Sequence, residues 1–130
     1  MANKKKKDYE FVARQKYADM SPRKLRPYAT LIRGRYADEA LELLRFLPNK
    51  SARLLEAVLN SALGNAEDRG TRNLNELIVS ESCIDGAPIL KRHMPRARGT
   101  AYPIKRRYSH IRITLTDVDL KDEQTQPAEE

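Results

Sequence analysis

Apolar residues recur at helical spacing in the middle of the chain. One stripe, with intervals of three and four positions, predicts a helix over residues 50–67 that stops at Asp68-Arg69-Gly70. A second stripe predicts a helix over residues 38–47, ended by Pro48. The two stripes consist of Leu55, Val58, Leu59, Ala62 and Ala66, and of Ala40, Leu41, Leu44 and Leu47. Each stripe covers one side of its helix, so both helices are expected to pack on a neighbouring layer.

A third helix is expected near the start of the chain. Ser21 can cap free backbone N–H groups, and Pro22 suits the first helical position because its missing donor is not needed there. Gly34 can end the helix in a left-handed conformation. Pro27 removes one backbone hydrogen bond inside the helix, so we expect a bend there. The apolar side of this helix consists of Leu25, Ala29 and Ile32.

From residue 76 onward the period changes from helical to two, which indicates strands. Residues 77–79 and 83–84 are apolar, and residues 111–116 alternate strictly between Ile or Leu and Arg or Thr. A weaker alternation at Tyr9, Phe11 and Ala13 predicts a further strand. The expected fold class is therefore α+β, with three helices packed on a small three-stranded antiparallel sheet.

Residues 85–110 allow two interpretations. Asp85-Gly86 is a strong hairpin signal, which would pair residues 77–84 with residues 87–93. Alternatively, the chain bends or bulges at residues 85–88, turns at residues 95–99 and returns through residues 101–116. We favour the second interpretation, because the apolar strand near residue 113 needs a partner and residues 77–84 are the most apolar candidate. The segment between them, about residues 85–108, then forms a protruding β-hairpin arm of roughly 35–40 Å.

Charge follows this division of the chain. The 130 residues carry a net charge of +7, which favours a polyanionic partner. Residues 91–112 hold 8 basic side chains and no acidic one, whereas residues 117–130 hold 6 acidic and 1 basic. We therefore expect a basic N-terminal tail at residues 1–8, one domain at residues 9–116 that binds a polyanion, most simply a nucleic acid, and an acidic, disordered C-terminal tail at residues 117–130.

Several classes of protein are excluded by composition. No apolar run approaches the roughly 18–20 residues that span a bilayer, and no apolar stretch follows the basic N-terminus as a signal peptide requires. Cys83, His93 and His110 are too few for a zinc site, so no metal or cofactor is expected. Cys83 is expected to pack in the core, and no catalytic group is recognised. The protein is expected to be cytoplasmic, not an enzyme and not a membrane protein.

The arm carries uncompensated charge and few apolar anchors, and an isolated two-stranded hairpin is marginal in water. We therefore expect an external anionic partner to order it. Basic side chains also lie at the start of the first helix, where the free backbone N–H groups and the helix dipole already favour an anion. The residues expected to bind this anion are Ser21, Arg23, Lys24, Arg26, Lys91, Arg92, Arg96, Arg98, Gly99, Lys105, Arg106, Arg107, Ser109 and His110.

Residues 10–116 resemble the bacterial form of the large-subunit ribosomal protein L-twenty-two family. The motifs that carry the resemblance occur in family order and spacing. They are Ser21-Pro22-Arg23-Lys24, Leu31-Ile32-Arg33-Gly34, Asn60-Ser61-Ala62, Asn65-Ala66-Glu67, Lys91-Arg92-His93-Met94-Pro95-Arg96-Ala97-Arg98-Gly99, Ile104-Lys105-Arg106 and Ser109-His110-Ile111.

The resemblance implies a structural constituent of the large ribosomal subunit that binds 23S-type ribosomal RNA and aids assembly. It implies that the arm lines the nascent-peptide exit tunnel, so the partners are this RNA, neighbouring large-subunit proteins and the nascent polypeptide. The tunnel-lining hairpin tip implied by the resemblance is Leu90, Lys91, Arg92, His93 and Met94. The alternative is a free, nucleoid-like basic nucleic-acid-binding module, but such a module needs no isolated projection.

Overall fold

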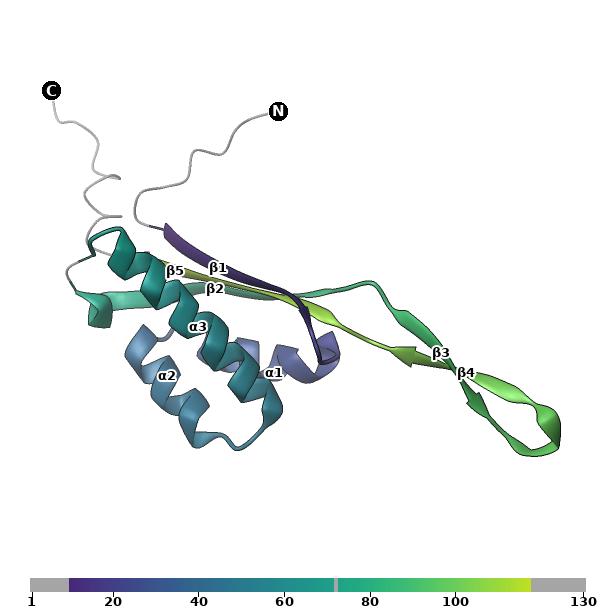
Figure 1. Ribbon diagram of the computed structural model, residues 1–130. Coiled ribbons are helices and arrows are strands. Elements are labelled where there is room, and N and C mark those ends of the chain that lie inside the picture. Colours follow the sequence, from purple (N-terminus) through teal and green to yellow (C-terminus); the bar gives the residue numbers. More distant parts are fainter. Residues whose placement is uncertain (1–9, 72, 118–130) are drawn as a thin grey trace, which may run out of the picture.

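The computed structural model describes residues 10–71 and 73–117, and it has the expected α+β fold (Figure 1). The expected N-terminal tail, Tyr9 and nearly all of the acidic tail lie outside these residues. The elements in chain order are β1 (Glu10–Ala18), α1 (Pro22–Ile32), α2 (Ala37–Phe46), α3 (Lys50–Asp68), the 3₁₀ turn η1 (Leu74–Glu76), β2 (Leu77–Gly86), β3 (Leu90–Pro95), the turn η2 (Ala97–Gly99), β4 (Ala101–Arg106) and β5 (Ser109–Asp117).

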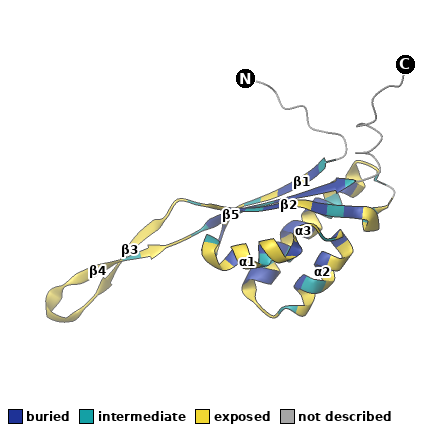
Figure 2. Cartoon of the chain, turned by 180° about the vertical axis from the view of Figure 1, so that it is seen from behind, coloured by how far each residue is buried: buried dark blue, intermediate teal, exposed yellow. Residues whose placement is uncertain are grey.

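The core lies between a three-stranded sheet and the helices. Strands β1, β5 and β2 form an antiparallel sheet in that order, with Phe11 opposite Leu115 and Leu115 opposite Val79. All three helices cover one face of this sheet (Figures 1 and 2). The apolar stripe predicted for residues 50–67 is buried throughout, as expected, and removal of its surface from water stabilises the domain.

Helix α1 begins and ends where the sequence predicts. Ser21 occupies the N-cap position, but its side chain makes no cap hydrogen bond, so that part of the expectation is wrong. Gly34 has the expected left-handed conformation, with φ +80°. Its N–H donates to the Val79 carbonyl at 2.8 Å, which attaches the end of α1 to the edge of β2. Pro27 lies inside the helix.

Side chains from the helical layer cap both edges of the sheet. At the β1 edge, Asn65 of α3 and Arg69, the residue after α3, donate to the carbonyls of Val12 and Glu10, each at 3.0 Å. At the β2 edge, Arg33, the residue after α1, donates to the Ser82 carbonyl at 2.6 Å. These occupied carbonyls are not available to a further strand, so the contacts disfavour edge-to-edge association.

The β-hairpin arm follows the second interpretation of residues 85–110. Strand β2 pairs with β5, while β3 pairs with β4 in a separate two-stranded sheet that projects from the domain (Figure 1). The Ala87 N–H donates to the Tyr108 carbonyl at 3.0 Å, and Leu90 lies opposite Arg106. Two residues of one strand therefore face one residue of the other. This is a bulge at the base of the arm, at a point where Pro88 has no N–H to donate.

The position of Cys83 differs from the expectation that it packs in the core. Leu77 and Val79 point into the core, but the register shifts between Val79 and Glu81. The extra residue, Ser80, reverses the alternation, so Ser82 becomes buried and Cys83 lies half-buried on the opposite, helix-free face. Cys83 is therefore not a core residue.

Candidate nucleic-acid interface

The arm displays almost all of its side chains to solvent. Every residue of β3 is exposed, and in β4 only Ile104 is half-buried (Figure 2). Side chains alternate between two faces of the ribbon. One face combines arginines with apolar groups: Leu90, Arg92, Met94, Tyr102, Ile104 and Arg106. The other carries Lys91, His93, Pro95, Ala101, Pro103 and Lys105.

Positive charge on the arm is not balanced within it. Lys91 lies directly opposite Lys105 in the β3–β4 register, an arrangement of like charges that destabilises a strand pair. The Arg92 guanidinium donates only to the adjacent Lys91 carbonyl, at 2.9 Å. The ion pairs found in the described residues all lie in the globular domain. The arm is therefore a projecting cationic ribbon that an anionic ligand would stabilise.

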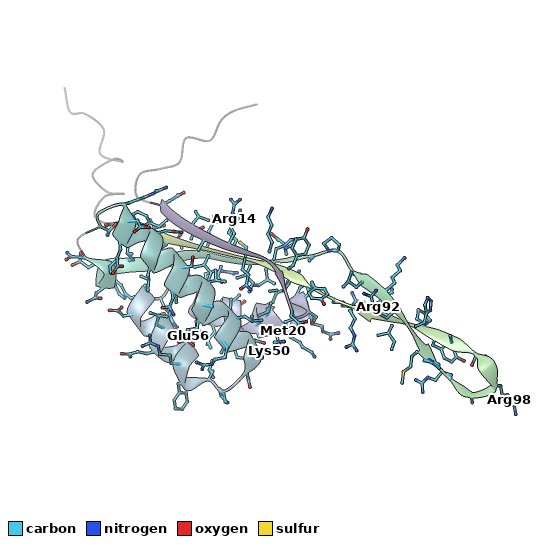
Figure 3. The ribbon with its side chains drawn as sticks, viewed as in Figure 1. Arg14, Met20, Lys50, Glu56, Arg92 and Arg98 are labelled. Atoms are coloured by element: carbon cyan, nitrogen blue, oxygen red, sulfur yellow. The ribbon has the colours of Figure 1, made fainter. Side chains whose placement is uncertain are left out.

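The turn of the arm places two arginines at its end. The Arg96 N–H donates to the Thr100 carbonyl at 2.7 Å and closes the loop. Arg98 and Gly99 both adopt left-handed conformations, with φ of 61° and 70°. This conformation costs a non-glycine residue about 1 kcal/mol, so the strained Arg98 is held outward at the end of the arm (Figure 3). Gly99 thus serves the turn of the arm.

The turn also corrects the expected position of the tip. Leu90 pairs with Arg106 at the base of the β3–β4 ladder, and Lys91 and Arg92 follow it in the proximal half. His93 and Met94 lie in the distal half, before the turn. The tip is formed by residues 96–100 instead, because strands β3 and β4 end at Pro95 and Ala101.

The prolines of the arm occupy positions that protect its open edges. Hydrogen-bonded pairs alternate with non-hydrogen-bonded pairs along an antiparallel ladder. Counting from the bonded pair Arg96–Thr100, both Pro95 and Pro103 fall at non-hydrogen-bonded positions. At such positions the backbone N–H of any other residue points to the open edge, so a proline removes a donor from the edge and not from the ladder. The pairing of β3 and β4 is therefore intact, while strand addition at either edge is disfavoured.

The start of α1 forms a second cationic group. Arg23, Lys24 and Arg26 are exposed there, and Ser21 is half-buried. Arg26 also lines a groove of about 300 Å³ between α1 and β2, together with Arg33. The remaining lining residues are Ala29, Thr30, Ser82, Cys83, Ile84 and Asp85. The expected cations are accessible to an anion, although Asp85 places one negative charge in the groove.

Ser109 and His110 have structural roles that the sequence did not reveal. Ser109 is fully buried, and its Oγ donates to the Met20 carbonyl at 2.9 Å. The expectation that the Ser109 side chain contacts RNA is therefore wrong. His110 is half-buried, and its Nδ1 accepts the Tyr17 N–H at 3.1 Å. Through these contacts both residues fix the junction between β1, β5 and the start of α1.

Two further arginines face each other on the sheet. Arg14 of β1 lies directly opposite Arg112 of β5. The pKa of the Arg112 guanidinium is raised above its usual value, chiefly by its hydrogen bond to Cys83. Sequence analysis missed this pair, because 97 residues separate the two arginines and only the register brings them together.

Neither a membrane span nor a metal centre emerges from the described part of the chain. In residues 10–71 and 73–117, no helix combines the length and apolar character needed to cross a bilayer. The same residues contain no group of three or more metal-ligating side chains.

Comparison with known proteins identifies relatives along most of the chain. Large ribosomal subunit protein uL22 of Rhodopirellula baltica is 44% identical over 115 residues, covering 85% of this chain and 97% of the relative. The uL22 protein of Finegoldia magna is 45% identical and covers 81% of this chain and 94% of the relative. The uL22 protein of Desulforamulus reducens is 47% identical and covers 78% of this chain and 90% of the relative. The family model for ribosomal protein L22p/L17e matches residues 13–116. With its globular domain and its cationic arm both inside the matched region, the chain belongs to the ribosomal protein L22p/L17e family.

Proposed function

We propose that the protein is a structural constituent of the large ribosomal subunit that binds the ribosomal RNA through its arm and the start of α1. The observation that carries this proposal is the uncompensated charge of the arm, where Lys91 lies opposite Lys105 and no acidic residue occurs between residues 91 and 112. Family membership supports the ribosomal setting. RNA supplies a dense array of phosphates that offsets this repulsion.

The two faces of the arm suit different parts of an RNA. On one face, Arg92 and Arg106 alternate with apolar side chains, a combination that can stack on unpaired bases and hold phosphate oxygens with a planar fork. On the other face, Lys91 and Lys105 offer compact charges to phosphates. At the distal end, the Arg96 guanidinium lies 6.0 Å from the centre of the Tyr102 ring, so the ring already supports one cation.

The shape of the arm supports a role inside the subunit. A ribbon with no core of its own gains nothing by projecting into solvent, where it is only marginally stable. Inserted between RNA segments, the same ribbon contacts phosphates along both faces and joins segments that are distant in the RNA sequence. This bridging favours subunit assembly, and the reach of the ribbon accords with a tunnel-lining role beside the nascent polypeptide and neighbouring proteins.

Sedimentation tests this proposal. We expect the full chain to remain with the large subunit through a high-salt wash, because an inserted arm is held by more than screened surface charge. A variant in which Asn-Gly replaces residues 88–107 should be released by the same wash. Retention of that variant would show that the globular domain, and not the arm, holds the protein.

The alternative is a free basic module that binds nucleic acid outside the ribosome. It predicts that the wild-type chain moves to light fractions in high salt and that duplex DNA competes equally with ribosomal RNA. The projecting arm is the observation against it, since binding to the outside of a duplex does not require an isolated ribbon.

A further inference from the structure

We propose that the helix-free face of the central sheet is a second RNA-binding surface, separate from the arm and from α1. It would hold a phosphate between Arg14 and Arg112 and stack an unpaired base on Tyr17. The inference rests on the proposed function, because the ligand is a further segment of the same RNA.

The arginine pair is the first observation. Arg14 and Arg112 occupy directly opposed positions of β1 and β5, where Cβ atoms are typically about 5 Å apart. In the free protein this opposition of like charges is unfavourable. Figure 3 places Arg14 on the side of β1 turned away from the helices. Two planar guanidinium groups at this spacing can share one phosphate, which would convert repulsion into attraction.

The hydrogen-bonding capacity of Arg112 is only partly used. Its Nη2 contacts the Cys83 Sγ at 3.6 Å and lies 3.5 Å from a Glu81 carboxylate oxygen. Its buried Nε has no hydrogen-bond partner within the structure. Glu81 is exposed and forms only a long ion pair, so it neutralises little of the charge, and Asp85 acts on Arg112 without forming an ion pair with it. Arg14 is exposed, and no described acidic group pairs with it.

Tyr17 supplies a platform beside the arginines. The register of β1 shifts between Gln15 and Ala18, so Lys16 and Tyr17 together face His110. Tyr17 has a left-handed φ of 58° and a side chain that is 62% exposed. A tyrosine held in this strained conformation is a feature typical of functional sites.

His110 holds the platform and adds a donor. Its Nδ1 accepts the Tyr17 N–H, so the proton of the neutral ring is on Nε2. The two rings meet edge to face, with centroids 5.0 Å apart and an interplanar angle of 84°. Tyr17 remains 62% exposed beside this contact, so much of its ring surface is open to a base. His110 and Arg112 are two positions apart on one strand face, or about 7 Å.

The combination favours RNA over an acidic protein. Cations alone would suit either partner, but an exposed aromatic face beside an arginine pair fits a base and its adjoining phosphate. Asp85 lies opposite His110, and Glu81 lies near Arg112, both on the β2 side. The favourable path for a negatively charged backbone therefore runs along β1 and β5, toward the base of the arm.

Binding of the full chain to large-subunit ribosomal RNA, measured over a range of salt concentrations, tests this surface. Tyr17→Gly removes the ring together with its contact to His110 but suits the positive φ, so its melting temperature should change little, while affinity should fall about fivefold or more. Arg14→Gln with Arg112→Gln should lower the slope of log affinity against log salt by about 2. Arg35→Gln with Arg45→Gln is the matched control, because both arginines already pair with glutamates on the helices.

The result separates the two proposals. The bound protein should protect certain nucleotides of the RNA from chemical modification. The second surface is established if some of this protection is lost with Tyr17→Gly and with the Arg14→Gln, Arg112→Gln double variant (the sheet variants) but is kept with a Lys91→Gln, Lys105→Gln double variant (the arm variant). If the sheet variants behave like the control while the arm variant loses affinity, the second surface is refuted and the proposed function stands. If the arm variant also matches the control, the proposed function fails as well.

Discussion

Lys91 lies directly opposite Lys105 in the two-stranded arm, so the arm opposes two positive charges where a stable hairpin would pair opposite ones. The arm has no buried side chain that offsets this cost. This opposition lowers the stability of the isolated arm, and a bound anionic ligand would offset that loss. The proposed RNA partner follows from this relationship more directly than from the total charge of the chain.

Reversal of one of these charges should change stability and binding in opposite directions. Lys105→Glu creates a cross-strand ion pair with Lys91 and should stabilise the arm by about 0.2–1 kcal/mol. The same change should weaken binding to large-subunit RNA and lower its salt dependence. Amide exchange in β3 and β4 measures the first effect, and filter binding measures the second. Lys105→Gln is the control for loss of charge alone, and tighter RNA binding by Lys105→Glu would contradict the proposal.

Removal of the arm should leave the globular domain folded. The Ala87 N–H bonds to the Tyr108 carbonyl, so Asn-Gly in place of residues 88–107 can close a short hairpin at that point. No residue in the deleted segment belongs to the core. We expect a single cooperative thermal transition within a few degrees of that of the full chain. A broad, non-cooperative transition would show that the arm supports the core.

Ser109→Ala should affect stability and not RNA binding. The substitution removes the buried Oγ that donates to the Met20 carbonyl, and an unpaired buried acceptor costs about 1–3 kcal/mol. Denaturant unfolding should show this loss, while RNA affinity under conditions where the variant is folded should equal that of the wild type. Lower affinity at unchanged stability would restore Ser109 to the interface.

Arg53 should stabilise the end of α2. Its Nη2 donates to the carbonyls of Leu44, Arg45 and Leu47 at 2.7, 2.9 and 2.6 Å, and thereby satisfies groups that the helix leaves unpaired. Arg53→Ala should lower the free energy of unfolding by about 1–2 kcal/mol. This is less than the loss of a fully buried, charged hydrogen bond, because the site is partly exposed. Arg53→Lys should recover only part of this, since an ammonium lacks the planar fork. Equal stability of all three proteins would contradict the capping role.

Sequence alone predicted features that depend on local pattern. The helical stripe around Leu59 and the alternation around Ile113 fixed the elements that meet in the core, and the need for a strand partner identified the arm. Features that depend on register were missed. Ser80 reverses the alternation of β2 and turns Cys83 outward, an effect invisible in composition. Ser109 resembled an interface residue until the fold placed it against the Met20 carbonyl.

The proposed insertion of the arm into the large subunit can be tested most directly by photo-crosslinking from its tip. A photoreactive residue at Arg98, at the end of the arm, is compared with one at Phe46, which is 85% exposed on α2. In translating ribosomes, we predict that position 98 labels both ribosomal RNA and a radiolabelled nascent chain, and that position 46 labels no nascent chain. If position 98 labels neither, the arm does not enter the subunit, and the proposed function is wrong.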